Sequence, residues 1–212
     1  MPPADSTTDW AGDPTTDWTI TPTADSPAAP TTDSPAAPTA DWTAADRAVV
    51  EAQLGRPPRG AVAVAWRCPC GRPGVVATAP LLEDGRPFPT TFYLTCPRAV
   101  RLVSQLESEG AMAVWNDRLT ADPDLAGAYR LAHADYLARR QALARRLGQD
   151  DRPLGQVSAG GMPERVKCLH ALAGHALAAG PGINPVGDAT LERLGPFWRG
   201  PCQPPVQAAV SA

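Results

Sequence analysis

The sequence lacks any apolar run of the roughly 18 residues that a membrane-spanning helix needs. Its N-terminus also lacks the basic, apolar and small-residue order of a signal peptide. Both absences predict a cytoplasmic protein with no membrane partner. Lysine is nearly missing too, because Lys167 is the only one in the chain and every other basic residue is arginine. There is no basic arm and no RNA-binding aromatic motif, so nucleic acid is not an expected partner and the arginines of residues 139–146 are expected to form a solvated helix end.

Cysteine occurs five times, an odd number, in a chain without secretory features. A disulfide framework is therefore not expected, and reduced thiols or metal ligands fit better. Positive charge is missing from the first 42 residues, which contain seven aspartates and no lysine or arginine, a net charge of −7. Since the whole chain carries −3, the remainder carries −3 − (−7) = +4. The chain thus divides into an acidic segment and a mildly basic body.

The acidic segment also repeats with a period of eight residues. A threonine opens each block and a proline closes each complete one, at Pro14, Pro22, Pro30 and Pro38. Such regular prolines interrupt any helix, and the few apolar side chains cannot offset the entropy of ordering the chain. We expect residues 1–42 to be a disordered tail that acts as a spacer, as an acidic recognition segment, or as a repeat expansion without a function of its own.

Order is expected to begin at Thr43, which forms a capping box with Asp46 for a helix that Gly55 ends. Period-two patterns and β-branched or aromatic residues predict strands at 61–67, 75–79 and 90–95, and helical spacing predicts helices at 97–110, 123–147 and 163–179. The expected fold class is α+β, a small antiparallel sheet of about three strands packed with about four to five helices. Residues 43–200 are expected to form a single domain, followed by a loose C-terminal tail at 201–212.

Three stretches of the body resemble a known family: residues 87–97 (PFPTTFYLTCP), 160–170 (GGMPERVKCLH) and 180–188 (GPGINPVGD). They are similar to the actinobacterial domain-of-unknown-function family 501, and the resemblance extends over about residues 46–198. It implies no particular activity, because the family has no established biochemical function. From the genes near its members, a septum formation initiator and an exopolyphosphatase, it implies a bacterial cytoplasmic setting and a link to cell division or polyphosphate metabolism. The octad repeat has no counterpart in the family pattern.

Thiols supply one candidate site, for zinc, which favours four such ligands in a tetrahedron. The candidate ligands are first Cys68, Cys70, Cys96 and Cys168, and beside them His170 and His175. If residues 163–179 form one helix, Cys168 and His170 point apart, and Cys168 and His175 lie about 10 Å apart along the axis, so at most one helical residue could join the other cysteines. The alternative is that the cysteines are buried as small apolar side chains or remain reduced thiols.

A second candidate site, for an anion, lies at Gly160 and Gly161. Paired glycines allow backbone N–H groups to converge, and the helix start expected after Pro163 adds partial positive charge. Arg165 and Lys167 would be unfavourable for that helix start, so a bound phosphate or a carboxylate partner would offset them. The GxxxxGK(S/T) pattern of a Walker loop is absent, and no GxGxxG follows a strand.

The weakest candidates are catalytic residues: Cys168 as a nucleophile, His175 as a base and Asp188 as an orienting acid. The sequence favours a cytoplasmic binding or adaptor domain that could hold zinc and that has an anion site at the Gly160–Gly161 helix start. One alternative is an enzyme acting on a phosphorylated or nucleotide-like ligand. Another is an interaction protein for a division-related partner.

Overall fold

The structure is a computed structural model that describes residues 42–198. Its elements follow the chain in the order α1 (Ala44–Leu54), β1 (Ala61–Arg67), β2 (Pro73–Thr78), β3 (Phe92–Leu94), α2 (Pro97–Ser108), α3 (Ala111–Ala121), α4 (Pro123–Leu147), a 3-10 helix (Arg152–Leu154), α5 (Leu169–Ala179) and α6 (Pro185–Leu194). The α+β class and the three-stranded antiparallel sheet are confirmed. Helices α3 and α6 are additional to the four helices that the sequence patterns locate. Residues 1–41 of the expected N-terminal tail (1–42) and the whole expected C-terminal tail (201–212) lie outside the described residues.

The sheet has the strand order β1-β2-β3, so β2 is central. Every residue of β2 is buried, as a strand that is covered on both faces requires. Val76 pairs with Tyr93, and Val75 pairs with Leu94. Because neighbouring residues of a strand point to opposite faces, Val76 and Tyr93 lie on one face of the sheet and Val75 and Leu94 on the other.

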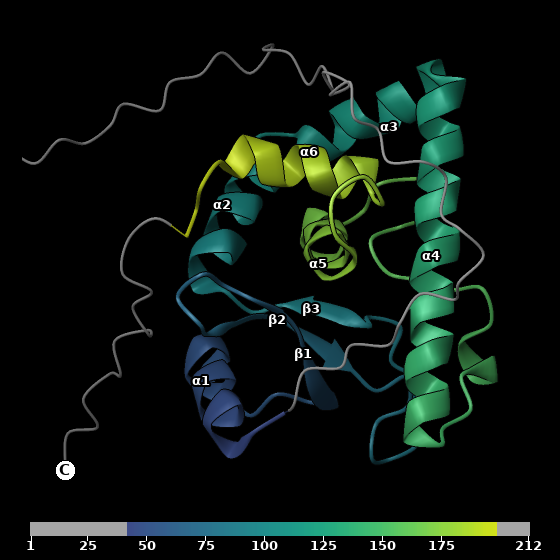
Figure 1. The fold of residues 1–212 in the computed structure, drawn as a ribbon. Helices are drawn as coiled ribbons and strands as arrows, with labels where there is room; N and C mark the ends of the chain where they lie inside the picture. The colour runs from purple at the N-terminus through teal and green to yellow at the C-terminus, as the bar shows by residue number, and fades with distance from the viewer. Residues whose placement is uncertain (1–41, 199–212) are drawn as a thin grey trace, which may run out of the picture.

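Helices cover both faces of this sheet, and the long helix α4 runs along one side of the molecule (Figure 1). α5 packs on the face that bears Val75, within the main hydrophobic core. It approaches β3 closely because Gly174 has no side chain: a Cβ there would lie 3.0 Å from the Phe92 carbonyl oxygen. α1 packs on the opposite face, where Val50 and Val76 belong to a smaller buried cluster.

Local capping sets where α1 and α4 begin, as expected. Thr43 and Asp46 form the capping box of α1, and the Asp122 side chain accepts hydrogen bonds from the first turn of α4. The Asp46 carboxylate also accepts hydrogen bonds from both terminal guanidinium nitrogens of Arg67, at 2.7 and 2.8 Å. These bonds join the start of α1 to the end of β1. This contact with Arg67 outweighs the effect of burial and lowers the pKa of Asp46 to about 2.

The helix expected over residues 163–179 begins only at Leu169. The preceding segment forms turns instead, since Gly160 and Gly161 have φ angles of 74° and 94°, outside the range of a right-handed helix. The Gly160 carbonyl oxygen accepts a hydrogen bond of 2.7 Å from the Lys167 N–H, so the loop closes on itself before α5 starts.

One arginine of the expected solvated helix end is buried. Arg140 is 1% exposed, although it lies in α4 among other arginines. Its guanidinium donates to Asp151 Oδ2 at 3.1 Å, to the Gly155 carbonyl at 2.6 Å and to the Val157 carbonyl. The buried charge is tolerated because these acceptors replace water. Arg140 therefore holds the segment after α4 against the helix.

Candidate functional site

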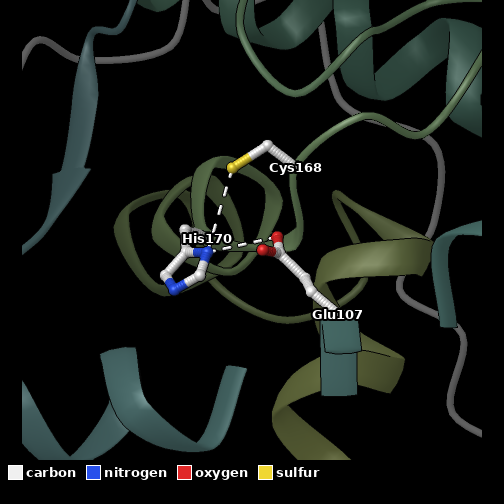
Figure 2. Close-up of side chains that lie close together, drawn as sticks. All are labelled: Glu107, Cys168 and His170. Atoms are coloured by element: carbon white, nitrogen blue, oxygen red, sulfur yellow. Dashed lines mark hydrogen bonds and ion pairs between the residues drawn. The ribbon is translucent and has the colours of Figure 1, made fainter. Parts of the chain in front are cut away.

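Three side chains with metal-binding atoms meet where the end of α2 approaches the start of α5 (Figure 2). Glu107 lies in the last turn of α2, Cys168 is the residue before α5, and His170 lies in the first turn of α5. One ligand atom of each lies within 4.8 Å of the other two. Among residues 42–198, no other group of three or more cysteine, histidine, aspartate or glutamate side chains is this close.

The contacts within the site centre on His170 Nδ1. Glu107 Oε1 lies 3.1 Å from this nitrogen, and Cys168 Sγ lies 3.9 Å from it. Glu107 Oε1 also accepts a hydrogen bond of 2.6 Å from the Leu169 N–H. Cys168 makes no side-chain cap to α5. The Glu107 carboxylate therefore satisfies a backbone donor at this helix N-terminus, where negative charge is favourable.

The second ring nitrogen of His170 also faces acceptors. Nε2 lies 3.1 Å from the Val100 carbonyl oxygen and 3.2 Å from Ser104 Oγ. Because a carbonyl oxygen and a carboxylate can only accept, both ring nitrogens carry a proton and the imidazole is positively charged. The contact with Cys168 raises the pKa of His170 most, burial opposes it, and the charge of Glu107 raises it further, to about 9.

The structure corrects the expected directions of Cys168 and His170. Two residues so spaced inside one helix would point apart. Cys168 instead precedes α5, with φ −156° and ψ 110°, an extended conformation. Its side chain does not follow the helical direction and points toward the His170 ring (Figure 2). The late start of α5 therefore creates the pair that a longer helix would prevent.

The four cysteines predicted as zinc ligands do not meet in one group. Cys68 follows β1 and is buried, Cys96 is buried at the start of α2, and Cys70 is exposed. Within the described residues, only Cys168 of the four belongs to a group of three close metal-ligand side chains, and none of the four forms a disulfide. Glu107 is the member of that group that the sequence patterns miss, because nothing local indicates that the end of α2 meets the start of α5.

His175, the predicted base, is a fully buried residue of α5. Its Nε2 lies 2.9 Å from Asp135 Oδ1. Asn184 Oδ1 accepts from the Gly187 N–H, so the Asn184 amide nitrogen is the atom that donates to His175 Nδ1, at 3.1 Å. His175 is thus a neutral imidazole that accepts at Nδ1 and donates from Nε2 to Asp135. Burial lowers its pKa, in keeping with this neutral form.

Asp188, the predicted orienting acid, lies in the first turn of α6 and accepts a hydrogen bond of 2.9 Å from the Gly182 N–H. Burial raises its pKa to about 6. The hydrogen bonds of Cys168, His175 and Asp188 go to different partners, so the structure does not join the three in one catalytic network.

The predicted anion site at Gly160 and Gly161 lacks the helix on which it depends, because α5 starts later. Arg165 and Lys167 are exposed on the loop before that helix. A Cβ at Gly161 would lie 2.5 Å from the Arg165 carbonyl oxygen, so this glycine allows the loop to fold tightly on itself. The first N–H group of α5 already binds the carboxylate of Glu107.

Comparison with known proteins gives a family and no activity. The family profile described as "Protein of unknown function (DUF501)" matches residues 64–192, a stretch that contains the whole Glu107, Cys168 and His170 group. No curated protein and no solved structure matches the chain. No helix among the described residues is long and apolar enough to cross a membrane. The cytoplasmic location, the phosphate-bearing ligand and the division-related partner stay predictions.

Proposed function

The chain belongs to the DUF501 family of proteins of unknown function, and from the geometry of its own residues we propose that it is a metal-binding domain that holds one zinc-type ion between Glu107, Cys168 and His170. Carboxylate, thiolate and imidazole are all ligands that zinc accepts. Three protein ligands leave the fourth position of a tetrahedron for water or a substrate. This arrangement is typical of catalytic zinc sites, whereas structural sites use four protein ligands.

The spacing of the ligand atoms is the observation that carries this proposal. Zinc bonds of about 2.3 Å to sulfur and about 2.0 Å to nitrogen, at a tetrahedral angle, place these two atoms about 3.5 Å apart. Cys168 Sγ and His170 Nδ1 lie 3.9 Å apart, and His170 Nδ1 and Glu107 Oε1 lie 3.1 Å apart. These two pairs need to move by only a few tenths of an ångström to bind one ion. The third pair, Cys168 Sγ and the Glu107 carboxylate, lies within 4.8 Å.

Contacts behind the ligands support the same arrangement. The Val100 carbonyl accepts a hydrogen bond from His170 Nε2, which leaves Nδ1 as the ligand atom. The Leu169 N–H orients the Glu107 carboxylate. Histidines that bind metals usually donate their other N–H to a carbonyl or a carboxylate, and ligand carboxylates are themselves hydrogen-bonded. Both conditions are met here.

Metal binding must displace the proton on His170 Nδ1. The pKa of His170 is raised to about 9, first by Cys168 and then by Glu107 against the effect of burial, so protons compete with the ion at neutral pH. The apparent zinc affinity is therefore expected to rise as the pH approaches about 9.

Titration of the chelated full chain with zinc and with cobalt tests the proposal. We expect about one ion per chain and a thiolate-to-cobalt charge-transfer band that Cys168→Ser removes. His170→Gln and Glu107→Gln should weaken zinc binding by roughly ten-fold or more. Cys70→Ser is the matched control, because this exposed thiol lies outside the group and its loss should leave the affinity unchanged.

Native mass spectrometry gives the outcome that would contradict the proposal. A folded chain that keeps its metal-free mass in excess zinc does not have this site. A Cys168→Ser variant with unchanged zinc affinity and an unchanged cobalt spectrum would equally rule it out. Circular dichroism of each variant separates loss of the site from loss of the fold.

Thiol chemistry by the metal-free protein is a second candidate function. The positively charged His170 lies beside Cys168 Sγ at the N-terminus of α5, and a cation in that position promotes the reactivity of a cysteine. His170→Gln should then slow the alkylation of Cys168 by iodoacetamide at neutral pH, as measured by peptide mass mapping. Zinc should protect Cys168 from the same reagent. An alkylation rate that does not change in His170→Gln would remove this candidate.

A further inference from the structure

Two adjoining cavities lie on the α1 face of the sheet, opposite to the face on which α5 packs. Their volumes are about 360 and 640 Å³, and small-molecule sites usually measure about 300 to 1,000 Å³. Arg56, Pro58 and Arg59, in the loop between α1 and β1, line both cavities. No residue of the proposed metal site lines either of them, so this is a separate place on the molecule.

The smaller cavity has apolar and aromatic walls. It is lined by Val76 and Tyr93, which are paired across β2 and β3, by Leu54 at the end of α1 and by Phe88. Tyr93 and Phe88 are only partly buried, so ring surface remains accessible. Aromatic side chains pack favourably against other flat rings. This cavity suits a flat aromatic group.

The larger cavity is positively charged. Its charged lining residues are Arg47, Arg56, Arg59, Arg86, Glu83 and Asp84. Four guanidinium groups against two carboxylates leave an excess of two positive charges. Arg86 donates to Asp84 at 2.6 Å, whereas no carboxylate of residues 42–198 forms an ion pair with Arg47, Arg56 or Arg59. Those three arginines are therefore available to an anion.

Hydrogen bonds hold the backbone around the larger cavity in place. Between β2 and β3, the Leu82 N–H donates to the Arg86 carbonyl and so closes a turn. The Gln149 side chain, just after α4, binds both the N–H and the carbonyl of Leu81, at 3.2 and 3.3 Å. A wall that is already ordered loses little conformational entropy when a ligand binds.

We propose that the two cavities form one binding site for a small molecule that carries both a phosphate group and a flat aromatic ring system, the chemistry of a nucleotide. The ring lies against Tyr93 and Phe88 in the smaller cavity. The phosphate binds Arg56 and Arg59, which line both cavities, with Arg47 farther along the larger one. A planar guanidinium matches phosphate through two parallel hydrogen bonds. Because arginines supply the positive charge, this site requires no metal ion.

Calorimetric titration of the full chain with adenosine 5′-monophosphate tests the proposal. We expect saturable binding that is tighter than the binding of inorganic phosphate or of adenosine, because each of these lacks one half of the ligand. Arg56→Gln/Arg59→Gln should lose roughly ten- to hundred-fold in affinity, since it removes charged hydrogen bonds to the phosphate. Tyr93→Ser should weaken binding of the nucleotide and leave binding of inorganic phosphate unchanged.

Arg130→Gln/Arg145→Gln is the matched control, because both arginines are exposed on α4 and line neither cavity. It removes the same charge and should leave the affinity unchanged. Equal losses in the two double variants would show a general charge effect and overturn the proposal. So would the absence of saturable nucleotide binding to the folded chain, or an equal affinity for inorganic phosphate. Thermal unfolding of each variant establishes that it is folded.

Discussion

The charge of His170 makes the stability of the metal-free protein depend on pH. Cys168 is the largest cause that raises its pKa from 6.5 to about 9, burial opposes it, and Glu107 adds to it. Since the folded-state pKa lies above the unfolded one, the stabilisation is complete below pH 6.5 and is lost as the pH rises through about 9. The folded protein should therefore lose stability over that interval.

The size of the effect follows from the shift in pKa. A difference of about 2.5 pKa units, at about 1.4 kcal/mol each, gives an upper bound of about 3.4 kcal/mol. The His170 side chain is 24% exposed, so water screens part of its interaction with Glu107. We therefore expect the contribution to the free energy of unfolding to be about 2 kcal/mol.

Urea unfolding of the chelated protein at about pH 6 and about pH 10 measures this contribution in the wild type and in His170→Gln. Between the two pH values, the free energy of unfolding of the wild type should fall by about 2 kcal/mol more than that of the variant. The titration of other groups affects both proteins and largely cancels in this difference. Equal losses would refute a charged His170. Nuclear magnetic resonance of the His170 ring should show a pKa near 9 in the wild type and a lower pKa in Cys168→Ser and in Glu107→Gln.

Two further predictions test packing, with urea unfolding as the measurement. Arg140→Met should destabilise the fold by about 3 kcal/mol, because it removes the buried donor of three charge-assisted hydrogen bonds, to the Asp151 carboxylate and to the Gly155 and Val157 carbonyls. It should also speed hydrogen exchange in residues 151–157, and unchanged exchange would contradict the anchoring role. Gly187→Ala should destabilise by about 2 kcal/mol or more, because its Cβ would lie 2.3 Å from the Leu172 carbonyl oxygen. Gly127→Ala is its control, a helical position with the nearest atom at 3.8 Å, and should stabilise by up to about 1 kcal/mol; similar effects of both substitutions would refute the close helix contact.

Signals that act over a few residues are sufficient to place most of the helices and strands. The capping box of Thr43 and Asp46 starts α1, and Gly55, with a φ of 68°, ends it. The Asp122 cap and Gly148 bound α4 in the same way. These interactions join residues that are close in the sequence, so a single sequence is enough to recognise them.

Contacts between distant parts of the chain determine where α5 starts and how the site is assembled, and no local sequence pattern shows either. The start of α5 depends on the loop that the bond from Lys167 to Gly160 closes, and the direction of the Cys168 side chain depends on that start. Glu107 binds His170 across 63 positions of the sequence. No helical or strand period relates residues so far apart, so the site appears only when α2 and α5 pack together.

Glu107 connects this helix junction with the chemistry of the site. Its Oε1 accepts from both the Leu169 N–H and His170 Nδ1–H, so in the metal-free protein a proton lies where the proposed ion binds. Replacing that proton by zinc leaves the bond to Leu169 in place, because a carboxylate has lone pairs for both interactions. Metal binding therefore exchanges a proton for an ion at a junction of α2 and α5 that is already formed. Zinc affinity and pH-dependent stability should for this reason both change around one value, the His170 pKa of about 9, although they are measured by unrelated methods.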